Sequence, residues 1–386
     1  MKIGILTQPL HNNYGGLLQN FALQQVLKGM GHDVETLDWD AKYSKLRMWL
    51  SRGKQMLLYQ INKQVEAPRY KPNDAEFNYI SQHTHKFIDR YLSVCPDRAE
   101  RREELRRIAN MRQYEAMVVG SDQVWRPDYN PWLKAMFLDF TEGMNMKRVT
   151  YAASFGTSTW TFSPAMTESC ALLAKKFDLI TVREKSGVDR CREHLGVEAI
   201  HVLDPTMLLD KEDYIRVVEA EKEPVSAGTL FHYILDPSDE KKALIESVAT
   251  KQGLHPFTVM PKCQAENRTK LDVKNRIEDC VFPTVTSWLR GFMDSKMVIV
   301  DSFHGAVFSI IFNKPFWVIA NSKRGNARFE SLLGMFGLVD RMIASETETA
   351  TVNWLEPIYW DRVDEKRHHE AERCKKLLLD VIGKII

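Results

Sequence analysis

The chain has few cysteines, and none of them lie close together in sequence. Six occur in 386 residues, with no CxxC pair and no spacing typical of metal ligands. This pattern argues against a disulfide-rich secreted scaffold and against a zinc-binding domain, and it predicts reduced thiols and no metal. The cysteines are Cys95, Cys170, Cys191, Cys263, Cys280 and Cys374.

Long hydrophobic runs and an excess of one charge are also absent. The apolar run at the N-terminus, Met1–Thr7, becomes polar too soon for a signal peptide, and no run approaches the length of a transmembrane helix. With 53 basic and 51 acidic residues, the net charge is +2, without the basic excess of a nucleic-acid-binding protein. These absences predict a cytoplasmic protein with no nucleic-acid partner, and the length indicates about two domains.

The first structural unit lacks the glycine-rich fingerprint of dinucleotide-binding domains. An apolar run rich in β-branched residues, Lys2–Thr7, is followed by the polar turn His11–Gly16 and by helical spacing of apolar residues over Leu17–Met30. A second strand follows at Val34–Asp38. This order predicts the opening of a doubly wound α/β domain. Since GxGxxG is missing from the loop, the sequence argues against a nicotinamide-dependent dehydrogenase.

Short apolar runs then alternate with helical patterns along the rest of the chain. Polar residues follow most of these runs, and ligands of open parallel sheets bind at the carboxyl ends of the strands. The predicted strands are Ala116–Gly120, Arg148–Ser154, Phe177–Val182, Ala199–Leu203, Leu230–Leu235, Phe257–Met260, Met297–Val300 and Pro315–Ile319.

A composition change over Glu219–Gly228, rich in Glu and Lys around Pro224, indicates a domain boundary. We therefore predict two Rossmann-like, doubly wound α/β domains that face each other across a cleft. The expected boundaries are residues 1–222 for the first domain and 223–350 for the second. A C-terminal helical segment is expected over 351–386.

The segment Ala41–Lys71 interrupts the alternation and opens a basic insertion over about residues 41–107. It holds eight Lys or Arg against one Glu, interleaved with apolar residues such as Leu46, Trp49 and Leu57. A basic amphipathic segment of this kind can lie on an anionic membrane surface. The alternative is a helical insertion that packs its apolar face on its own domain.

The most specific candidate for chemistry is the stretch from Met297 to Asn313. A buried strand ends at Asp301, Ser302 is the expected N-cap of a helix, and His304 falls in the first helical turn. The first turn presents unpaired N–H groups and the positive end of the helix dipole, so it attracts anions. An imidazole there places a proton carrier beside an anion site. The alternative is a histidine packed under a loop.

Several motifs together resemble those of the polysaccharide pyruvyl transferase family, over residues 3 to about 333. That family transfers the pyruvyl group of phosphoenolpyruvate to a sugar as a cyclic ketal, and its members look like GT-B glycosyltransferases. The resemblance therefore implies a GT-B-like fold, phosphoenolpyruvate as co-substrate without a further cofactor, and a sugar or lipid-linked oligosaccharide acceptor. The motifs are Gly4–Thr7, Asn13–Gln24, Gly120–Trp125, Arg183–Ser186, Leu203–Thr206 and Asp301–Gly305.

The resemblance also implies roles for individual residues. His304 is the expected proton carrier, because histidine titrates near neutral pH. The residues expected on the phosphoenolpyruvate side are Arg183, Ser302, Phe303, Gly305, Arg324 and Arg328. Those expected on the acceptor side are Asn13, Gly15, Gly16, Gln19, Asp122, Gln123 and Trp125. The alternatives are a surface salt bridge for Arg183, turn glycines, a capping Asp122 and a core Trp125.

One departure from the family pattern concerns the anion site. Some members carry an arginine two residues before the histidine, where this chain has Ser302. Lys323, Arg324 or Arg328 can supply the missing cation, or Ser302 and backbone N–H groups suffice. Three functions remain open: pyruvyl transfer to a surface polysaccharide or its lipid-linked precursor, glycosyl transfer from a nucleotide sugar, and glycan binding without catalysis.

Overall fold

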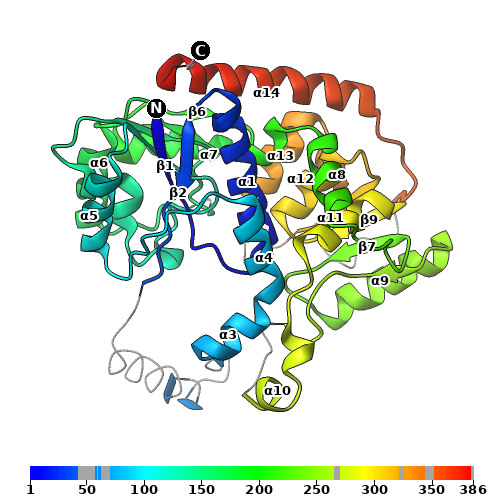
Figure 1. Cartoon of the computed structure of the whole chain (residues 1–386). Coiled ribbons are helices and arrows are strands. Elements are labelled where there is room, and N and C mark those ends of the chain that lie inside the picture. Colours follow the sequence, from blue (N-terminus) through cyan, green and yellow to red (C-terminus); the bar gives the residue numbers. More distant parts are fainter. Residues whose placement is uncertain are drawn as a thin grey trace.

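A computed structural model describes residues 1–41, 57–58, 60–61, 70–157, 159–264, 270–320, 326–343 and 352–383. The chain forms two α/β domains side by side, the first at the left of Figure 1 and the second at the right. Each domain is built on a parallel β-sheet. The predicted fold class, two Rossmann-like domains, is therefore confirmed.

The sheet of the first domain has the strand order β2-β1-β3-β4, with all pairs parallel. The short pair β5-β6 continues the sheet, because residues at the end of β4 form parallel bridges with Leu179 and Val182. The strands are β1 (Lys2–Leu6), β2 (Asp33–Thr36), β3 (Ala116–Val119), β4 (Lys147–Thr150), β5 (Thr181–Val182) and β6 (Ile200–His201). Helices described in this half are α1 (Tyr14–Gly29), α3 (Asp74–Ile80), α4 (Gln82–Tyr91), α5 (Arg102–Arg112), α6 (Pro164–Ala174) and α7 (Lys185–Arg190). Helix α8 (Lys211–Ala220) follows them in sequence and lies beside the second domain (Figure 1).

The sheet of the second domain has the order β11-β10-β9-β7-β8, again with all pairs parallel. Its strands are β7 (Leu230–Tyr233), β8 (Pro256–Phe257), β9 (Met297–Val300), β10 (Phe316–Ile319) and β11 (Met342–Ile343). The helices around it are α9 (Asp239–Gln252), α10 (Lys270–Asn275), α11 (Val285–Asp294), α12 (Phe303–Ile311) and α13 (Ala327–Phe336).

Alternate residues of each strand face opposite layers, as the pleat of a strand requires. In β9, Val298 and Val300 belong to a large apolar cluster that also contains Ile3 and Ile5 of β1. Met297 of the same strand faces a separate cluster on the far side of its sheet. One continuous core therefore joins the two domains, and it fixes where the ends of β1 and β9 lie.

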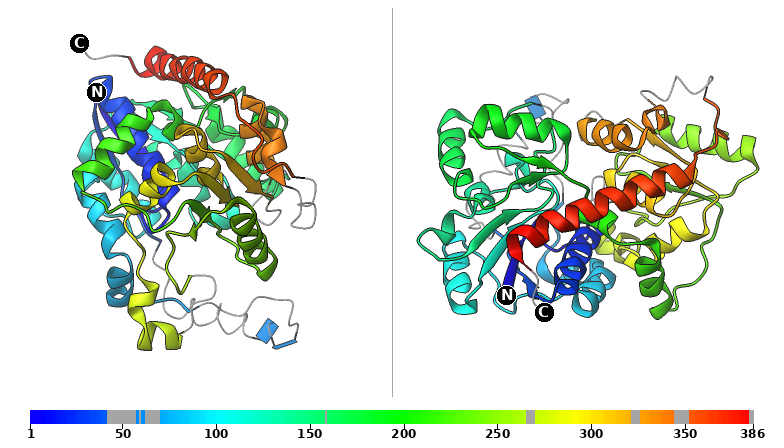
Figure 2. Two further views of the ribbon diagram at one scale, coloured as in Figure 1. Left: turned by 90° about the vertical axis from the view of Figure 1, so that its right-hand side faces the viewer. Right: turned by 90° about the horizontal axis from the view of Figure 1, so that it is seen from above.

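The C-terminal helix α14 (Trp360–Ile382) crosses from the second domain back to the first. Figure 2 shows it running over both domains, with the two termini close together. Arg367 of α14 donates to the carbonyl of Leu209 at 3.0 Å and to Asp210 at 2.9 Å, and Arg373 donates to the carbonyl of His201 at 2.8 Å. The predicted C-terminal helix is confirmed, and it connects the two domains.

Two elements of the structure differ from what the sequence predicted. The N-cap of α11 is Thr284, whose hydroxyl accepts from the N–H of Ser287, so the helix begins before the expected cap at residues 286–287. Strand β11 was not predicted, because its two residues are too few to show a period. Most of the basic segment 41–71 lies outside the described residues. In the part of the chain that the structure describes, no helix is long and apolar enough to span a membrane.

Candidate active site

His304 lies at the start of α12, where that helix follows directly from β9. The hydroxyl of Ser302 accepts a hydrogen bond from the N–H of Gly305 at 3.0 Å, so Ser302 is the N-cap that the sequence predicts. A Cβ on Gly305 would lie 2.8 Å from a methyl group of Val300, and glycine therefore lets the helix pack tightly on its strand. These contacts hold the imidazole, which is 8% exposed, at the boundary between the domains.

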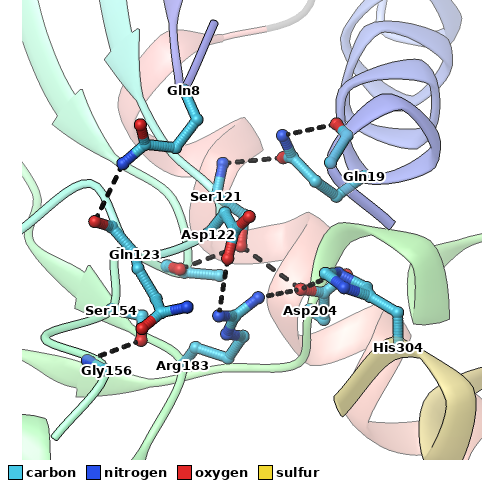
Figure 3. Close-up of polar contacts among 12 residues, drawn as sticks. Gln8, Gln19, Ser121, Asp122, Gln123, Ser154, Gly156, Arg183, Asp204 and His304 are labelled. Atoms are coloured by element: carbon cyan, nitrogen blue, oxygen red, sulfur yellow. Dashed lines mark hydrogen bonds and ion pairs between the residues drawn. The ribbon is translucent and has the colours of Figure 1, made fainter. Parts of the chain in front are cut away.

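Arg183 follows β5 and forms the centre of a buried ion-pair network (Figure 3). Its guanidinium donates to Asp204 at 2.9 Å and to Asp122 at 3.2 Å, and its side chain is 1% exposed. The surface salt bridge considered from the sequence is therefore wrong. Both terminal nitrogens face carboxylates, which places Arg183 beneath the site rather than at its open face.

Asp204 connects this network to His304. One of its carboxylate oxygens lies 3.6 Å from Nε2 of His304 and accepts from Arg183 and from the hydroxyl of Ser121. The other oxygen accepts from the N–H and the hydroxyl of Thr206, at 3.1 and 2.7 Å. Sequence reasoning did not select Asp204 for the site. The available signal was its position at the carboxyl end of a predicted strand, in the motif Leu203–Thr206.

The charges of this network shift the pKa values of its members. Burial raises the pKa of Asp204, but His304 and Arg183 together outweigh burial and hold that pKa below its ordinary value. Burial likewise raises the pKa of Asp122, and Arg183 is the main group that brings it below the ordinary value. Burial, with the nearby charge of Arg183, lowers the pKa of Arg328 to about 10. At neutral pH both carboxylates are therefore charged, and Arg328 is still a cation.

A cavity of about 70 Å³ lies between the two domains, directly at His304. The guanidinium of Arg328 lies 5.8 Å from the ring of Phe303 in the cavity wall, and that of Arg183 lies 4.3 Å from the same ring. Residues of the first domain that line the cavity are Asn13, Gly15, Asp122 and Gln123. Those of the second domain are Tyr233, Leu235, Asp301, Ser302, Phe303, His304 and Arg328.

The structure thus brings together most of the predicted site residues but not all of them. Gln19 is fully buried, and its amide bonds the N–H of Ser121 and the hydroxyl of Thr7, so it holds the loop after β3. Trp125 is also fully buried; its ring stacks on Phe137 at 4.7 Å and is not available to a sugar. We leave both out of the proposed site.

Three other predicted positions need separate mention. Gly16 is not among the lining residues, and its backbone packs against the side chain of Asn13. Arg324 and the alternative cation Lys323 lie outside the described residues. Among the described residues, Arg328 is the only lysine or arginine that lines the cavity. No group of three or more metal-ligating side chains occurs in the described ranges.

Replacing Arg183 by methionine is expected to destabilise the protein more at pH 7 than at pH 4. The pKa values of Asp122 and Asp204 are lowered in the folded protein, so their charged carboxylates stabilise the fold above about pH 3.9, the pKa of an unfolded aspartate. This stabilisation is lost as the pH falls through the pKa values of the folded protein. Without Arg183, burial raises the pKa of Asp122, so this carboxylate is charged and opposes folding at pH 7 but is increasingly protonated toward pH 4.

Breaking a buried ion pair costs about 3–5 kcal/mol. The check is the unfolding temperature of both proteins at the two pH values, with Arg192→Met, in an exposed ion pair, as the control. Equal losses at both pH values would contradict the network described above.

Comparison with solved structures identifies the fold. UDP-GlcNAc 2-epimerase from Neisseria meningitidis, bound to UDP-GlcNAc, is similar with a TM-score of 0.52, 11% sequence identity and coverage of 99% of each chain. UDP-GlcNAc 2-epimerase from Methanocaldococcus jannaschii is similar with a TM-score of 0.54, 10% identity and coverage of 98% of this chain and 100% of the other. These are GT-B enzymes, so the predicted GT-B-like arrangement is confirmed.

Comparison at the level of sequence identifies the family. No curated protein sequence matches the chain. The family model described as polysaccharide pyruvyl transferase matches residues 13–323, a range that includes His304, Arg183, Asp122 and Asp204. The chain therefore belongs to the polysaccharide pyruvyl transferase family.

Proposed function

We propose that the protein transfers the pyruvyl group of phosphoenolpyruvate to a sugar of a surface polysaccharide or of its lipid-linked precursor. The product is a cyclic pyruvate ketal, and phosphate is released. The family match supports this reaction, and the observation that carries it is the position of His304. The imidazole faces an interdomain cavity beside a charged carboxylate and a cation, all held by buried contacts.

The donor half of the cavity suits an anionic substrate. Phosphoenolpyruvate carries a phosphate and a carboxylate, which require cations and N–H donors. Arg328 lines the cavity as a cation, and the first turn of α12 presents N–H groups that have no partner within the helix. Phe303 supports Arg328 from one side. We propose that these groups bind phosphoenolpyruvate, without a metal or a further cofactor.

In the proposed reaction His304 acts as a general acid and then as a general base. Its proton goes to the methylene carbon of phosphoenolpyruvate, which becomes a methyl group and leaves an oxocarbenium-like C2. A sugar hydroxyl adds to C2, and its proton returns to His304. A second hydroxyl then displaces phosphate from C2 and gives its proton to the leaving phosphate, and this closes the ketal. Asp204 stabilises the positive charge that the imidazole carries before the first of these proton transfers and after the second.

The acceptor half of the cavity is formed by the first domain. Asn13, Asp122 and Gln123 line it and offer amide and carboxylate groups, which pair well with hydroxyls. Asn13 already donates to Asp122 at 3.3 Å, so a sugar hydroxyl can enter an existing hydrogen-bond pair. We propose these three residues as the acceptor contacts. The backbone of Gly15 forms the floor between them and His304.

The decisive experiment offers the protein both kinds of donor with candidate acceptor glycans. Phosphoenolpyruvate should give phosphate release and a gain of one pyruvyl ketal in the mass of the acceptor. A hexose gain from a nucleotide sugar, with no reaction of phosphoenolpyruvate, would replace this proposal by glycosyl transfer. Glycan binding without any turnover would support the non-catalytic alternative.

We also propose that the enzyme acts in the cytoplasm at the inner face of the membrane, where a lipid-linked acceptor would be located. The basic segment 41–71 supports this proposal by its sequence. Two of the described side chains within it are apolar and exposed: Leu57 is 62% exposed and Ile61 is 74% exposed. Exposed apolar groups among basic residues are typical of a membrane-surface segment.

Neutralising the basic residues of this segment should release the protein from vesicles of anionic lipid and spare activity on a short soluble acceptor. Each lysine or arginine near such a surface contributes about 1 kcal/mol. The residues to replace by glutamine are Lys42, Lys45, Arg47, Arg52 and Lys54. The matched control replaces five exposed lysines elsewhere, Lys242, Lys251, Lys262, Lys296 and Lys366. If the wild-type protein does not bind anionic vesicles at low salt, the proposal is ruled out.

A further inference from the structure

A second and larger cavity, of about 340 Å³, lies in the first domain. Three segments form it: the start of α5, the loop 127–134 and the segment 161–166 that leads into α6. None of its residues lines the cavity at His304. The lining residues are Arg102, Pro127, Asn130, Pro131, Trp132, Leu133, Lys134, Thr161, Phe162, Ser163 and Met166.

Asn130 in the wall of this cavity has an unused hydrogen-bond acceptor. The residue is 3% exposed, and its amide nitrogen donates to the carbonyls of Gln123 and Val124 at 3.2 and 2.6 Å. These two carbonyls fix the orientation of the amide, because only the nitrogen can face them. Its oxygen is buried and has no hydrogen-bond partner among the described residues. A buried acceptor without a partner is costly, so this part of the wall is left unsatisfied by the described residues of the protein itself.

The rest of the wall is apolar with charged groups at its edge. The Trp132 ring is half-buried and packs on Trp39 at 4.9 Å, while Phe162 and Met166 add apolar surface. Lys134 and Arg102 also line the cavity, and Arg102 is held by Asp139 at 2.7 Å. An aromatic face beside hydroxyl-binding groups suits a sugar ring, which has apolar C–H faces and a polar edge.

One continuous loop joins the two cavities. Gln123 lines the cavity at His304, and seven residues later Asn130 lines the second cavity while donating to the backbone of Gln123. Between them, Arg126 donates to the side chain of Gln123 at 2.9 Å, and its guanidinium lies 4.2 Å from the ring of Tyr129. Tyr129 is 44% exposed. The loop that carries the exposed ring of Tyr129 therefore connects the acceptor half of the first cavity to the second cavity.

We propose that the second cavity is a subsite for a further sugar residue of the acceptor. The substrate class is then an oligosaccharide, whose reacting sugar lies at His304 and whose neighbouring part crosses Tyr129 to Trp132. This inference rests on the proposed function for the identity of the acceptor. Binding at the second cavity itself requires no chemistry at His304.

The test uses the full-length protein and an array of bacterial surface oligosaccharides printed beside their component monosaccharides. Wild type should bind at least one oligosaccharide more tightly than its monosaccharides. Trp132→Ala should weaken that binding by about ten-fold, because it removes the aromatic face. Thr161→Trp should weaken it as much by filling the cavity, since Thr161 is exposed and lines it. Ala165→Trp, on an exposed position of α6 outside the cavity, is the matched control.

The outcomes separate this proposal from the proposed reaction. If wild type prefers no oligosaccharide to its monosaccharides, or if Thr161→Trp binds as wild type does, the subsite does not exist. Protection against thermal unfolding by phosphoenolpyruvate is measured on the same variants and should not change. The protein could instead fail to bind phosphoenolpyruvate while Trp132→Ala and Thr161→Trp still lose glycan binding. That result would support the subsite and overturn pyruvyl transfer.

Discussion

Replacing His304 by alanine is expected to lower the turnover number of pyruvyl transfer by about 10²–10⁴-fold, the usual contribution of a general acid–base group. In the proposed reaction the imidazole carries the proton that reaches the methylene carbon and then accepts one from the sugar hydroxyl. Asp301, the carboxylate of the second domain that lines the cavity, already pairs with Lys241 at 2.8 Å, so His304 is the better placed proton carrier. Turnover is measured as phosphate release at saturating phosphoenolpyruvate.

The fold should tolerate this change. His304 makes no hydrogen bond through Nε2 within the described part of the chain, so its loss leaves the cap at Ser302 intact. The unfolding temperature of the variant should stay close to that of wild type. His232→Ala, on β7 of the same domain and outside the cavity, serves as the matched control and should remain active. A His304→Ala enzyme within a few-fold of wild-type turnover would remove His304 from the mechanism.

Replacing Gly15 by alanine should cost about 10²-fold in turnover while leaving helix α1 folded. A Cβ at this position would lie 2.1 Å from Nδ1 of His304 and 2.3 Å from Cγ of the same ring. Helix α1 cannot retreat easily, because Tyr14 and Leu18 on either side of Gly15 are fully buried. The imidazole must therefore leave its present position, in which Nε2 lies 3.6 Å from Asp204, and a displacement of about 1 Å in an active site can cost about 10²-fold.

The control for this prediction lies at the other end of the same helix. A Cβ on Gly29 would meet nothing within 4 Å, so Gly29→Ala should keep full activity and equal or higher stability. Turnover and unfolding temperature of both variants give the comparison. Full activity of Gly15→Ala would mean that the imidazole is not held against α1 during catalysis.

Local sequence patterns predicted the elements that present the site. We predicted a strand that ends at Asp301, a cap at Ser302 and a helix that carries His304, and the structure confirms all three. Each of these predictions depends on residues that are close neighbours in the sequence. The predicted Rossmann-like fold and most strands are confirmed for the same reason. Periodicity and capping depend on neighbours in sequence, which a single chain displays directly.

The arrangement of charges could not be predicted in this way. Asp122, Arg183 and Asp204 meet only after three strand ends are brought together, and each of them alone is an ordinary polar residue at the end of a strand. The interpretation of Trp125 as a ring that contacts a sugar failed for a related reason. Trp125 lies in a loop, where no period distinguishes a ring packed on Phe137 from a ring that faces a ligand.

The contact between His304 and Asp204 joins the two domains, so the shape of the molecule and its chemistry are linked. The proton carrier belongs to the second domain, whereas its carboxylate partner belongs to the first. Neither domain alone holds a complete acid–base centre. In the proposed reaction, water competes with the sugar for the reactive carbon, and addition of water would waste the donor as pyruvate. A centre built from both domains, at a cavity of about 70 Å³, confines proton transfer to a space with little room for water.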